Sequence, residues 1–191
     1  MRTAIRPTQL HFRRLASHFL SLTSGDRLLR FGSVLTDIDI VAYVERLFAS
    51  AANVFVVVEP DQDISGVLAL EFTSSDARLG LSVSSWARNF GIGKALLQRA
   101  GLLACARGSK TLFVPNLRFN TALQQLALSL GMNVACASGA LAAIQPHPTN
   151  GHEVLDDGFA GRITLADDSL RPRAESEAAD AGAVEPASTP S

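Results

Sequence analysis

A loop of glycines and cations at residues 88–94 carries the clearest chemical signal in the sequence. Gly91 and Gly93 lack a Cβ, so their backbone can approach a ligand closely or take a positive φ at little cost. Apolar residues then recur at helical spacing, at Ile92, Leu96, Ala100 and Leu103. The glycines therefore lie in the first turn of a helix, where free N–H groups and the helix dipole favour an anion such as phosphate.

Two cations, Arg88 before the glycines and Lys94 after them, add positive charge to this anion site. Two familiar phosphate loops do not fit it. A Walker A loop needs four residues between its glycines and a Lys-Ser/Thr pair, whereas Lys94 is followed by Ala95. A dinucleotide fingerprint needs a third glycine where Leu96 stands. A plain loop-to-helix junction, with glycines for tight packing, also fits the Gly-x-Gly taken alone.

The other residues of reactive type are scattered. Cys105 and Cys136 show no CxxC or Cys/His spacing, so neither a zinc site nor a disulfide framework is indicated. The four histidines are His11, His18, His147 and His152, and no pair of them has metal-ligand spacing. We expect all four to be structural or solvated. We expect none of them beside the strand that precedes the glycine loop. We predict no metal site.

The elements that position the glycine loop follow an α/β order. Residues 9–15 read as an opening strand, and residues 15–51 show helical spacing twice, with Asp37 placed to cap the second helix. Three strands in antiparallel hairpins follow, then the glycine-loop helix ending near Gly108. A short strand, a second capped helix and two strands around Ser138-Gly139 complete the order. This predicts a mixed sheet flanked by helices.

Composition and charge limit the possible partners. With 47% apolar residues and no apolar run near the roughly 20 residues of a membrane span, the chain reads as a globular protein without a membrane segment. Residues 1–145 hold 14 Lys plus Arg against nine Asp plus Glu, and residues 146–191 hold three against nine. A basic body with an acidic tail favours a small anionic ligand over nucleic acid. The Ala-, Pro-, Ser- and Glu-rich tail is expected to be largely disordered.

Residues 88–93 resemble motif A of the GCN5-related N-acetyltransferase (GNAT) superfamily, Gln/Arg-x-x-Gly-x-Gly/Ala. The strand at 79–83 stands where that family has its cofactor-facing strand, Asn120 stands at its usual asparagine, and Gly131-Met132 resembles its Gly-Phe ending. The resemblance covers residues 9–145, and it implies a GNAT domain that spans residues 1–145. It implies a GNAT-type α/β fold with a mixed, mostly antiparallel sheet of six to seven strands and about four helices.

The resemblance also implies acetyl-CoA as cofactor, held mainly by backbone. Strand residues would pair with its pantetheine arm and polarise the thioester carbonyl, loop amides would hold its pyrophosphate, and Asn120 would lie near its thiol. The implied cofactor-binding residues are Leu81, Ser82, Val83, Arg88, Asn89, Gly91, Ile92, Gly93, Lys94 and Asn120.

The usual catalytic side chains are missing. Where the family often has a strand glutamate this chain has Arg78, and where it often has a tyrosine it has Ala127. Glu71, on the adjacent strand, is our first candidate for a base, and Asp76 the second; either could equally be a solvated strand residue. Alternatively, positioning and the oxyanion contact suffice, or the protein binds acyl-CoA without turnover. Asp26, Arg27 and Arg30 are solvated helix residues or contacts for an acceptor.

The sequence thus predicts a cytoplasmic bacterial N-acetyltransferase that transfers an acetyl group directly to the amine of a small molecule or protein. Two other classes stay open: an acyl-CoA-binding sensor and a phosphate- or nucleotide-binding regulator. Arg78 would repel an ammonium group and could favour an acceptor with a carboxylate. Homodimers are common in this family, and the last strands would supply an interface.

Overall fold

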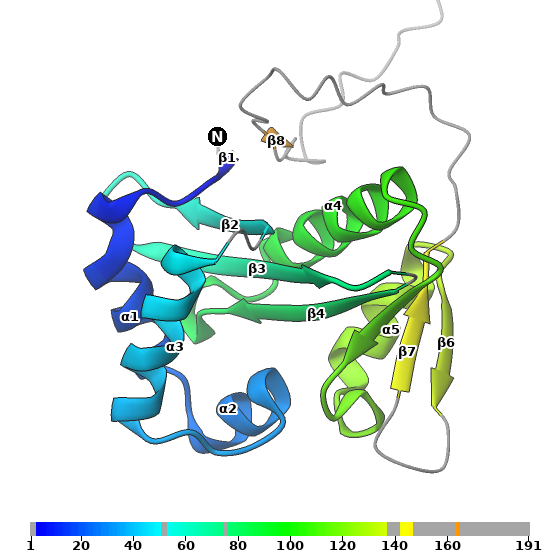
Figure 1. Cartoon of the computed structure of the whole chain (residues 1–191), viewed down its shortest axis with the longest axis horizontal. Coiled ribbons are helices and arrows are strands. Elements are labelled where there is room, and N and C mark those ends of the chain that lie inside the picture. The colour runs from blue at the N-terminus through cyan, green and yellow to red at the C-terminus, as the bar shows by residue number, and fades with distance from the viewer. Residues whose placement is uncertain (1–2, 51–52, 75, 137–141, 147–162, 165–191) are drawn as a thin grey trace, which may run out of the picture.

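A computed structural model of the chain describes residues 3–50, 53–74, 76–136, 142–146 and 163–164. One sheet runs through the molecule in the strand order β6-β7-β5-β4-β3-β2-β1-β8 (Figure 1). The strands are β1 (Thr3–Ile5), β2 (Asn53–Val58), β3 (Ile64–Phe72), β4 (Asp76–Val83), β5 (Thr111–Val114), β6 (Asn133–Cys136), β7 (Ala142–Gln145) and β8 (Ile163–Thr164). Among these described strands, only β4 and β5 pair in parallel.

In the part of the chain that the structure describes, five α-helices flank the sheet. They are α1 (Phe12–Leu20), α2 (Ser24–Phe31), α3 (Asp37–Ala49), α4 (Ile92–Ala106) and α5 (Thr121–Ser129). In Figure 1, α1 and α3 lie on one side of the sheet, α4 on the other, and α2 below β4. The predicted GNAT-type α/β fold is confirmed, with seven strands up to residue 145, the extra two-residue β8, and five helices where about four were expected.

The alternation of side chains in the central strands explains the two layers. In β2, Phe55 and Val57 belong to the core under α4, while Val54 and Val56 belong to the core under α1 and α3. Because successive strand residues point to opposite faces, a strand buried on both sides reads as an unbroken apolar run. "NVFVVV" is such a run.

Three details of the predicted first half are wrong. Residues 12–20 form a helix, because Phe12, Leu15 and Phe19 at spacings of three and four share one face, and the opening strand is the earlier β1. Residues 15–51 accordingly contribute to three helices instead of two. The cap of α3 is Thr36, whose hydroxyl accepts a hydrogen bond from the Asp39 amide at 3.2 Å, and Asp37 is the first helical residue.

Other sequence predictions are confirmed. The hairpins β2–β3 and β3–β4 are antiparallel, and α4 ends at Ala106 just before Gly108, whose φ of +70° is left-handed. The turn expected at Ser138-Gly139 and most of the predicted disordered tail, residues 147–162 and 165–191, lie outside the described residues. No helix in the described part is long and apolar enough to cross a membrane.

Candidate functional site

The strands β4 and β5 diverge at the centre of the sheet. They pair only over residues 76–78 and 111–113, whereas β4 continues to Val83 and β5 ends at Val114. The last part of β4 therefore has β3 as a hydrogen-bonding partner on one side and, among the described residues, no paired strand on the other. In Figure 1 the strands β5–β7 run in a different direction from β2–β4, with α2 under the opening. An extended ligand could complete the free edge of β4.

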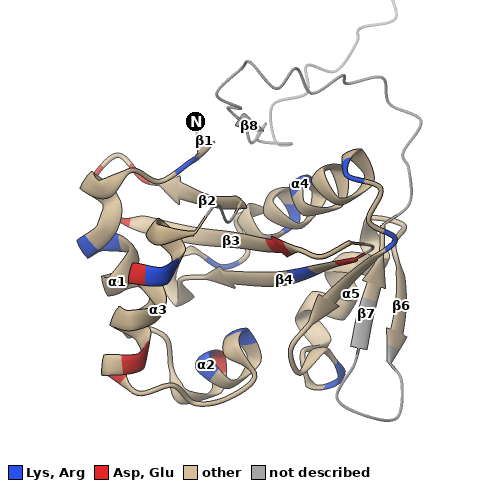
Figure 2. Cartoon of the chain, viewed as in Figure 1, with Lys and Arg blue, Asp and Glu red and all other residues tan. Residues whose placement is uncertain are grey.

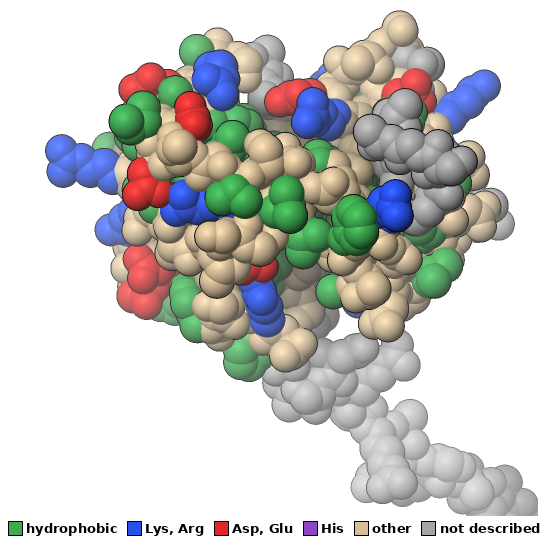
Figure 3. Space-filling model, turned by 90° about the horizontal axis from the view of Figure 1, so that it is seen from below, with side chains coloured by type: hydrophobic (Ala, Val, Ile, Leu, Met, Phe, Trp, Pro, Cys, Tyr) green, Lys and Arg blue, Asp and Glu red, His purple; other side chains and the backbone are tan. Residues whose placement is uncertain are grey.

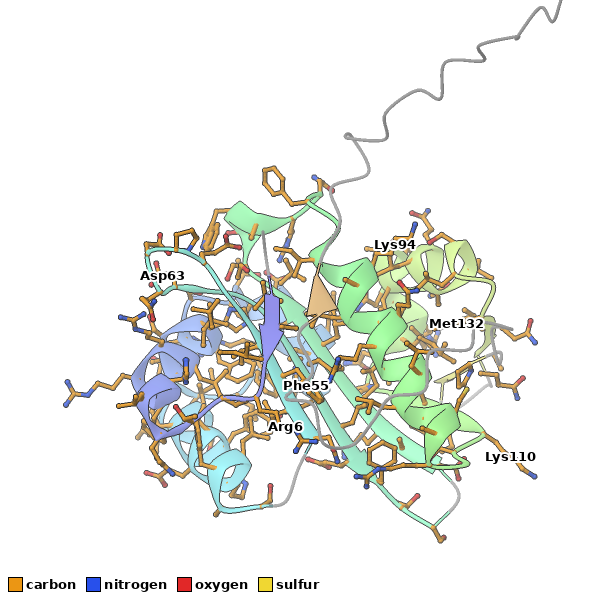
Figure 4. All side chains as sticks on the ribbon, turned by 90° about the horizontal axis from the view of Figure 1, so that it is seen from above. Arg6, Phe55, Asp63, Lys94, Lys110 and Met132 are labelled. Atoms are coloured by element: carbon orange, nitrogen blue, oxygen red, sulfur yellow. The ribbon has the colours of Figure 1, made fainter. Side chains whose placement is uncertain are left out.

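The glycine loop lies at the end of this opening and begins α4. Gly91 is the N-cap residue with a φ of +76°, and Asn89 also has a positive φ of +68°. No side chain caps the first amides of α4, so its N-terminal turn offers free N–H donors. Figure 4 shows Lys94 at this end of the helix, and Lys110 beyond the other end. The predicted anion site therefore has the expected backbone shape.

A cavity of about 410 Å³ joins the β4 edge to the glycine loop. It is lined by every residue that the sequence predicted to bind the cofactor: Leu81, Ser82, Val83, Arg88, Asn89, Gly91, Ile92, Gly93, Lys94 and Asn120. The helices α2 and α5 close its sides with Asp26, Arg30 and Leu126, among others. We call this space the strand-edge cavity.

Two of these residues have partners inside the protein. Asn120 is the N-cap of α5, where its Oδ1 accepts a hydrogen bond from the Leu123 amide at 3.0 Å. Arg88 forms an ion pair with Asp26 of α2 at 2.7 Å. Burial works to raise the pKa of Asp26, but hydrogen bonds from Thr23 and Arg88 and the charge of Arg88 outweigh it and hold that pKa below its usual value. An anion at the loop would compete with Asp26 for Arg88.

His18 does lie beside the cofactor-facing strand, contrary to expectation. Its Nε2 is 2.9 Å from the Ser82 hydroxyl, and its Nδ1 is 3.0 Å from the Ile64 carbonyl and 3.0 Å from the Ser84 hydroxyl. Since a carbonyl only accepts, Nδ1 carries the proton and Nε2 accepts from Ser82. Burial lowers the pKa of His18 to about 4; the Ile64 bond opposes this and the charge of Arg30 adds to it. His18 is thus a neutral buried anchor between α1 and the sheet.

The expected base, Glu71, lies away from the strand-edge cavity. It lines a second cavity, also of about 410 Å³, together with Arg78, its direct partner across β3 and β4. The two strands carry these charges side by side (Figure 2). Asp76 is not among the lining residues of either cavity, and Ala127 is fully buried. We call this second space the arginine cavity, after Arg30, Arg46 and Arg78 in its walls.

Arg30 was expected to be solvated or in contact with an acceptor, and it is buried, with 7% of its surface exposed. It lines both cavities, donates to the Tyr43 hydroxyl at 2.8 Å and stacks on the rings of Phe19, Phe31 and Tyr43. A Cβ at Gly80 would overlap its guanidinium. An isolated glycine inside a strand often marks such a close approach, so Gly80 was the available signal in the sequence.

Among the residues that the structure describes, no group of three or more His, Cys, Asp or Glu side chains could hold a metal ion. Cys105 is a free, half-buried thiol whose pKa is raised by burial, as befits a small packing residue.

Comparison with solved structures identifies the fold. The GNAT domain of PAT from S. lividans superimposes with a TM-score of 0.59 at 15% identity, covering 74% of this chain and 88% of that one. A putative acetyltransferase of Salmonella typhimurium, solved with its cofactor acetyl-CoA, gives 0.53 at 14% identity, with 81% and 99% covered. Spermidine N-acetyltransferase of Vibrio cholerae, solved with CoA and spermine, gives 0.55 at 12%, with 75% and 92% covered.

No protein-family model and no curated protein sequence matches the chain. The structural similarities establish that the chain has the GNAT fold.

Proposed function

We propose that this chain, which has the GNAT fold, is an acetyl-CoA-dependent N-acetyltransferase. The observation that carries the proposal is the strand-edge cavity, because ten residues expected to bind acetyl-CoA line one continuous space. Solved proteins of the same fold contain acetyl-CoA or CoA, which supports this choice of ligand. The bacterial source and cytoplasmic location remain predictions from the sequence.

The phosphates would lie on the first turn of α4. The amides of Ile92, Gly93 and Lys94 lie in the N-terminal turn of α4. This end of the helix carries the positive end of the helix dipole and therefore favours a negatively charged ligand. Lys94 adds a cation, and Arg88 adds another once it leaves Asp26. Gly91 fits here because its backbone is left-handed and no heavy atom lies within 4 Å of where its Cβ would be.

The pantetheine arm would extend along the open edge of β4 at residues 81–83. Backbone N–H groups at this edge would pair with its amides as a neighbouring strand does. One N–H aimed at the thioester oxygen would stabilise the negative charge that develops there during transfer. This role needs only backbone, so it tolerates the serine at position 82.

When bound, acetyl-CoA supplies an acetyl thioester: the acceptor amine attacks its carbonyl carbon, the C–S bond breaks, and CoA leaves as a thiolate that takes up a proton. The protein must accept one proton from the amine and deliver one to the thiolate. Glu71 is our candidate to accept the amine proton. Tyr43, the only tyrosine, lines the arginine cavity and accepts a hydrogen bond from Arg30, which lines both cavities; it is our candidate to protonate the thiolate.

Thiol release tests this proposal. Acetyl-CoA is mixed with a panel of amines, amino acids and peptides, and free CoA is measured for the native protein and for Glu71→Gln, Tyr43→Phe and Glu45→Gln. We expect acceptor-dependent release that falls about 100-fold in Glu71→Gln, with acetyl-CoA affinity unchanged. Glu45 is an exposed residue of α3 outside both cavities and serves as the control.

The alternative is an acyl-CoA-binding sensor without turnover. Arg78 and Ala127 at the two usual catalytic positions favour it. Acetyl-CoA binding without thiol release for any member of the panel would support this reading against the enzyme.

A further inference from the structure

The arginine cavity has an unusual charge for a site that receives amines. It lies between α2, α3 and the sheet, and its walls hold three arginines, Arg30, Arg46 and Arg78, against the single carboxylate of Glu71. Its formal charge is therefore positive even when Glu71 is ionised. Figure 3 shows the molecule from the side of α2, with hydrophobic side chains across the middle of this face and charged side chains around them.

Arg30 contributes a charge that no described carboxylate neutralises. It is buried, and among the described residues its Nε has no hydrogen-bond partner. Its guanidinium is fixed by the Tyr43 hydroxyl and the three aromatic rings, and it lies over Gly80. The Tyr43 hydroxyl is a neutral partner, so the positive charge of Arg30 stays uncompensated in this wall and favours an anion in the arginine cavity. Arg46 and Arg78 line the same cavity and are exposed.

The arginine cavity adjoins the strand-edge cavity along β4. Residues 78–80 line the first and residues 81–83 line the second, and Arg30 lines both. A molecule in the arginine cavity would therefore lie next to an acyl group held at the edge of β4. This places the acceptor in the arginine cavity.

We propose that the arginine cavity binds an acceptor amine that also carries a carboxylate, as a free amino acid does. The carboxylate binds Arg46 and Arg78, whose planar guanidinium groups suit carboxylate geometry. The amine faces the neighbouring strand-edge cavity, and its proton reaches Glu71, in the wall of the same arginine cavity, through water. Three nearby cations lower the pKa of the amine and so favour its uncharged, nucleophilic form. The statement that this ligand is the acceptor rests on the proposed function.

The same charges disfavour a polyamine. A molecule with several ammonium groups and no anion would place them among three arginines, where like charges repel. The proposed acceptor class therefore differs from a polyamine such as the spermine in the Vibrio cholerae structure.

Equilibrium binding tests the inference without any turnover. The probes are N-acetylated amino acids with small, aromatic and acidic side chains, each compared with its C-terminal amide, and spermine. The protein is native, Arg46→Gln/Arg78→Gln, or the control Arg13→Gln/Lys110→Gln, which removes two exposed charges outside both cavities. We expect at least one acid to bind at least about tenfold more tightly than its amide in the native protein and the control. This preference disappears in Arg46→Gln/Arg78→Gln.

Equal binding of every acid and its amide, no binding of any acid, or tighter binding of spermine would overturn the inference. So would a preference that survives in Arg46→Gln/Arg78→Gln. Titration of acetyl-CoA into the same samples separates the two proposals: lost cofactor binding contradicts the acetyltransferase, whereas cofactor binding without carboxylate preference contradicts only the acceptor class.

Discussion

At the scale of single residues, the two glycines of the loop have different roles. Gly91 has a left-handed φ of +76° with open space where a Cβ would lie, so its requirement comes from the backbone. A Cβ at Gly93 would make ordinary contacts with Leu126 and Val83 at 3.5 and 3.7 Å. The sequence pattern predicted that both glycines belong to the ligand-binding loop. It could not distinguish their roles, because residue spacing does not reveal backbone dihedral angles.

Gly91→Ala should therefore lower the free energy of unfolding by about 1 kcal/mol, the cost of holding an L-residue in the left-handed region. It should also weaken acetyl-CoA binding, because relaxation would move the first amides of α4. Gly93→Ala is the matched control and should leave stability nearly unchanged. Urea denaturation and calorimetric titration measure both effects, and equal losses in the two variants would contradict this account of the loop.

The ion pair between Asp26 and Arg88 holds a cation that the phosphates would otherwise attract. Asp26→Asn should tighten acetyl-CoA binding roughly threefold to tenfold at low salt, with a smaller gain at high salt, because partly exposed charges are screened. The control is Asp63→Asn, an equal change of charge on the opposite side of the molecule from Lys94 (Figure 4). In an Arg88→Gln background, Asp26→Asn should have a smaller effect, since only the direct repulsion between Asp26 and the phosphates remains. Weaker binding in Asp26→Asn would refute the competition.

His18 should make stability depend on pH. Its folded pKa of about 4 lies below the ordinary 6.5, so between these values the unfolded chain binds the extra proton. Stability is thus complete above pH 6.5 and falls as the pH drops toward 4, by about 2 kcal/mol between pH 7 and pH 5. Urea denaturation at both pH values measures this loss. His18→Gln should reduce the difference, and an undiminished pH effect in that variant would assign it to other groups.

At the scale of elements, α2 packs against β4 where an arginine side chain lies over a glycine. Arg30 of α2 lies over Gly80 of β4, with Phe19, Phe31 and Tyr43 around it. Sequence periodicity predicted β4 and the helical character of this region. It could not predict that α2 turns Arg30 inward, because the burial of that arginine depends on aromatic residues from three different helices.

Gly80→Ala should destabilise the protein by about 1–3 kcal/mol, the usual cost of overpacking, and should alter the junction of the two cavities. Arg30→Ala removes the group that the new methyl would meet. The double variant should therefore lose less stability than the sum of the two single changes, which a double-mutant cycle by urea denaturation measures. Strict additivity would show that Gly80 is not required by Arg30.

At the scale of the whole molecule, the sequence predicted more of the cofactor site than of the acceptor site. The part of the strand-edge cavity that the sequence predicted follows from local features, a strand, a glycine loop and a helix start, which lie within residues 81–94, whereas α2 and α5 close its sides. The arginine cavity brings together residues from 30 to 115, so only the folded chain reveals it. The sequence predicted a strand at residues 9–15, where the structure has the start of α1, because "LHFRRL" is short enough to fit either periodicity.

A calorimetric titration of the native chain with acetyl-CoA, alongside adenosine 3′,5′-bisphosphate, tests the central claim most directly. The bisphosphate retains an adenine nucleotide but lacks the pantetheine arm. We predict saturable binding of one acetyl-CoA per chain, at least about tenfold tighter than the bisphosphate, because the β4 edge adds contacts that only pantetheine can make. Equal affinities would indicate a nucleotide-binding regulator, and no binding of acetyl-CoA would contradict the assignment of the strand-edge cavity.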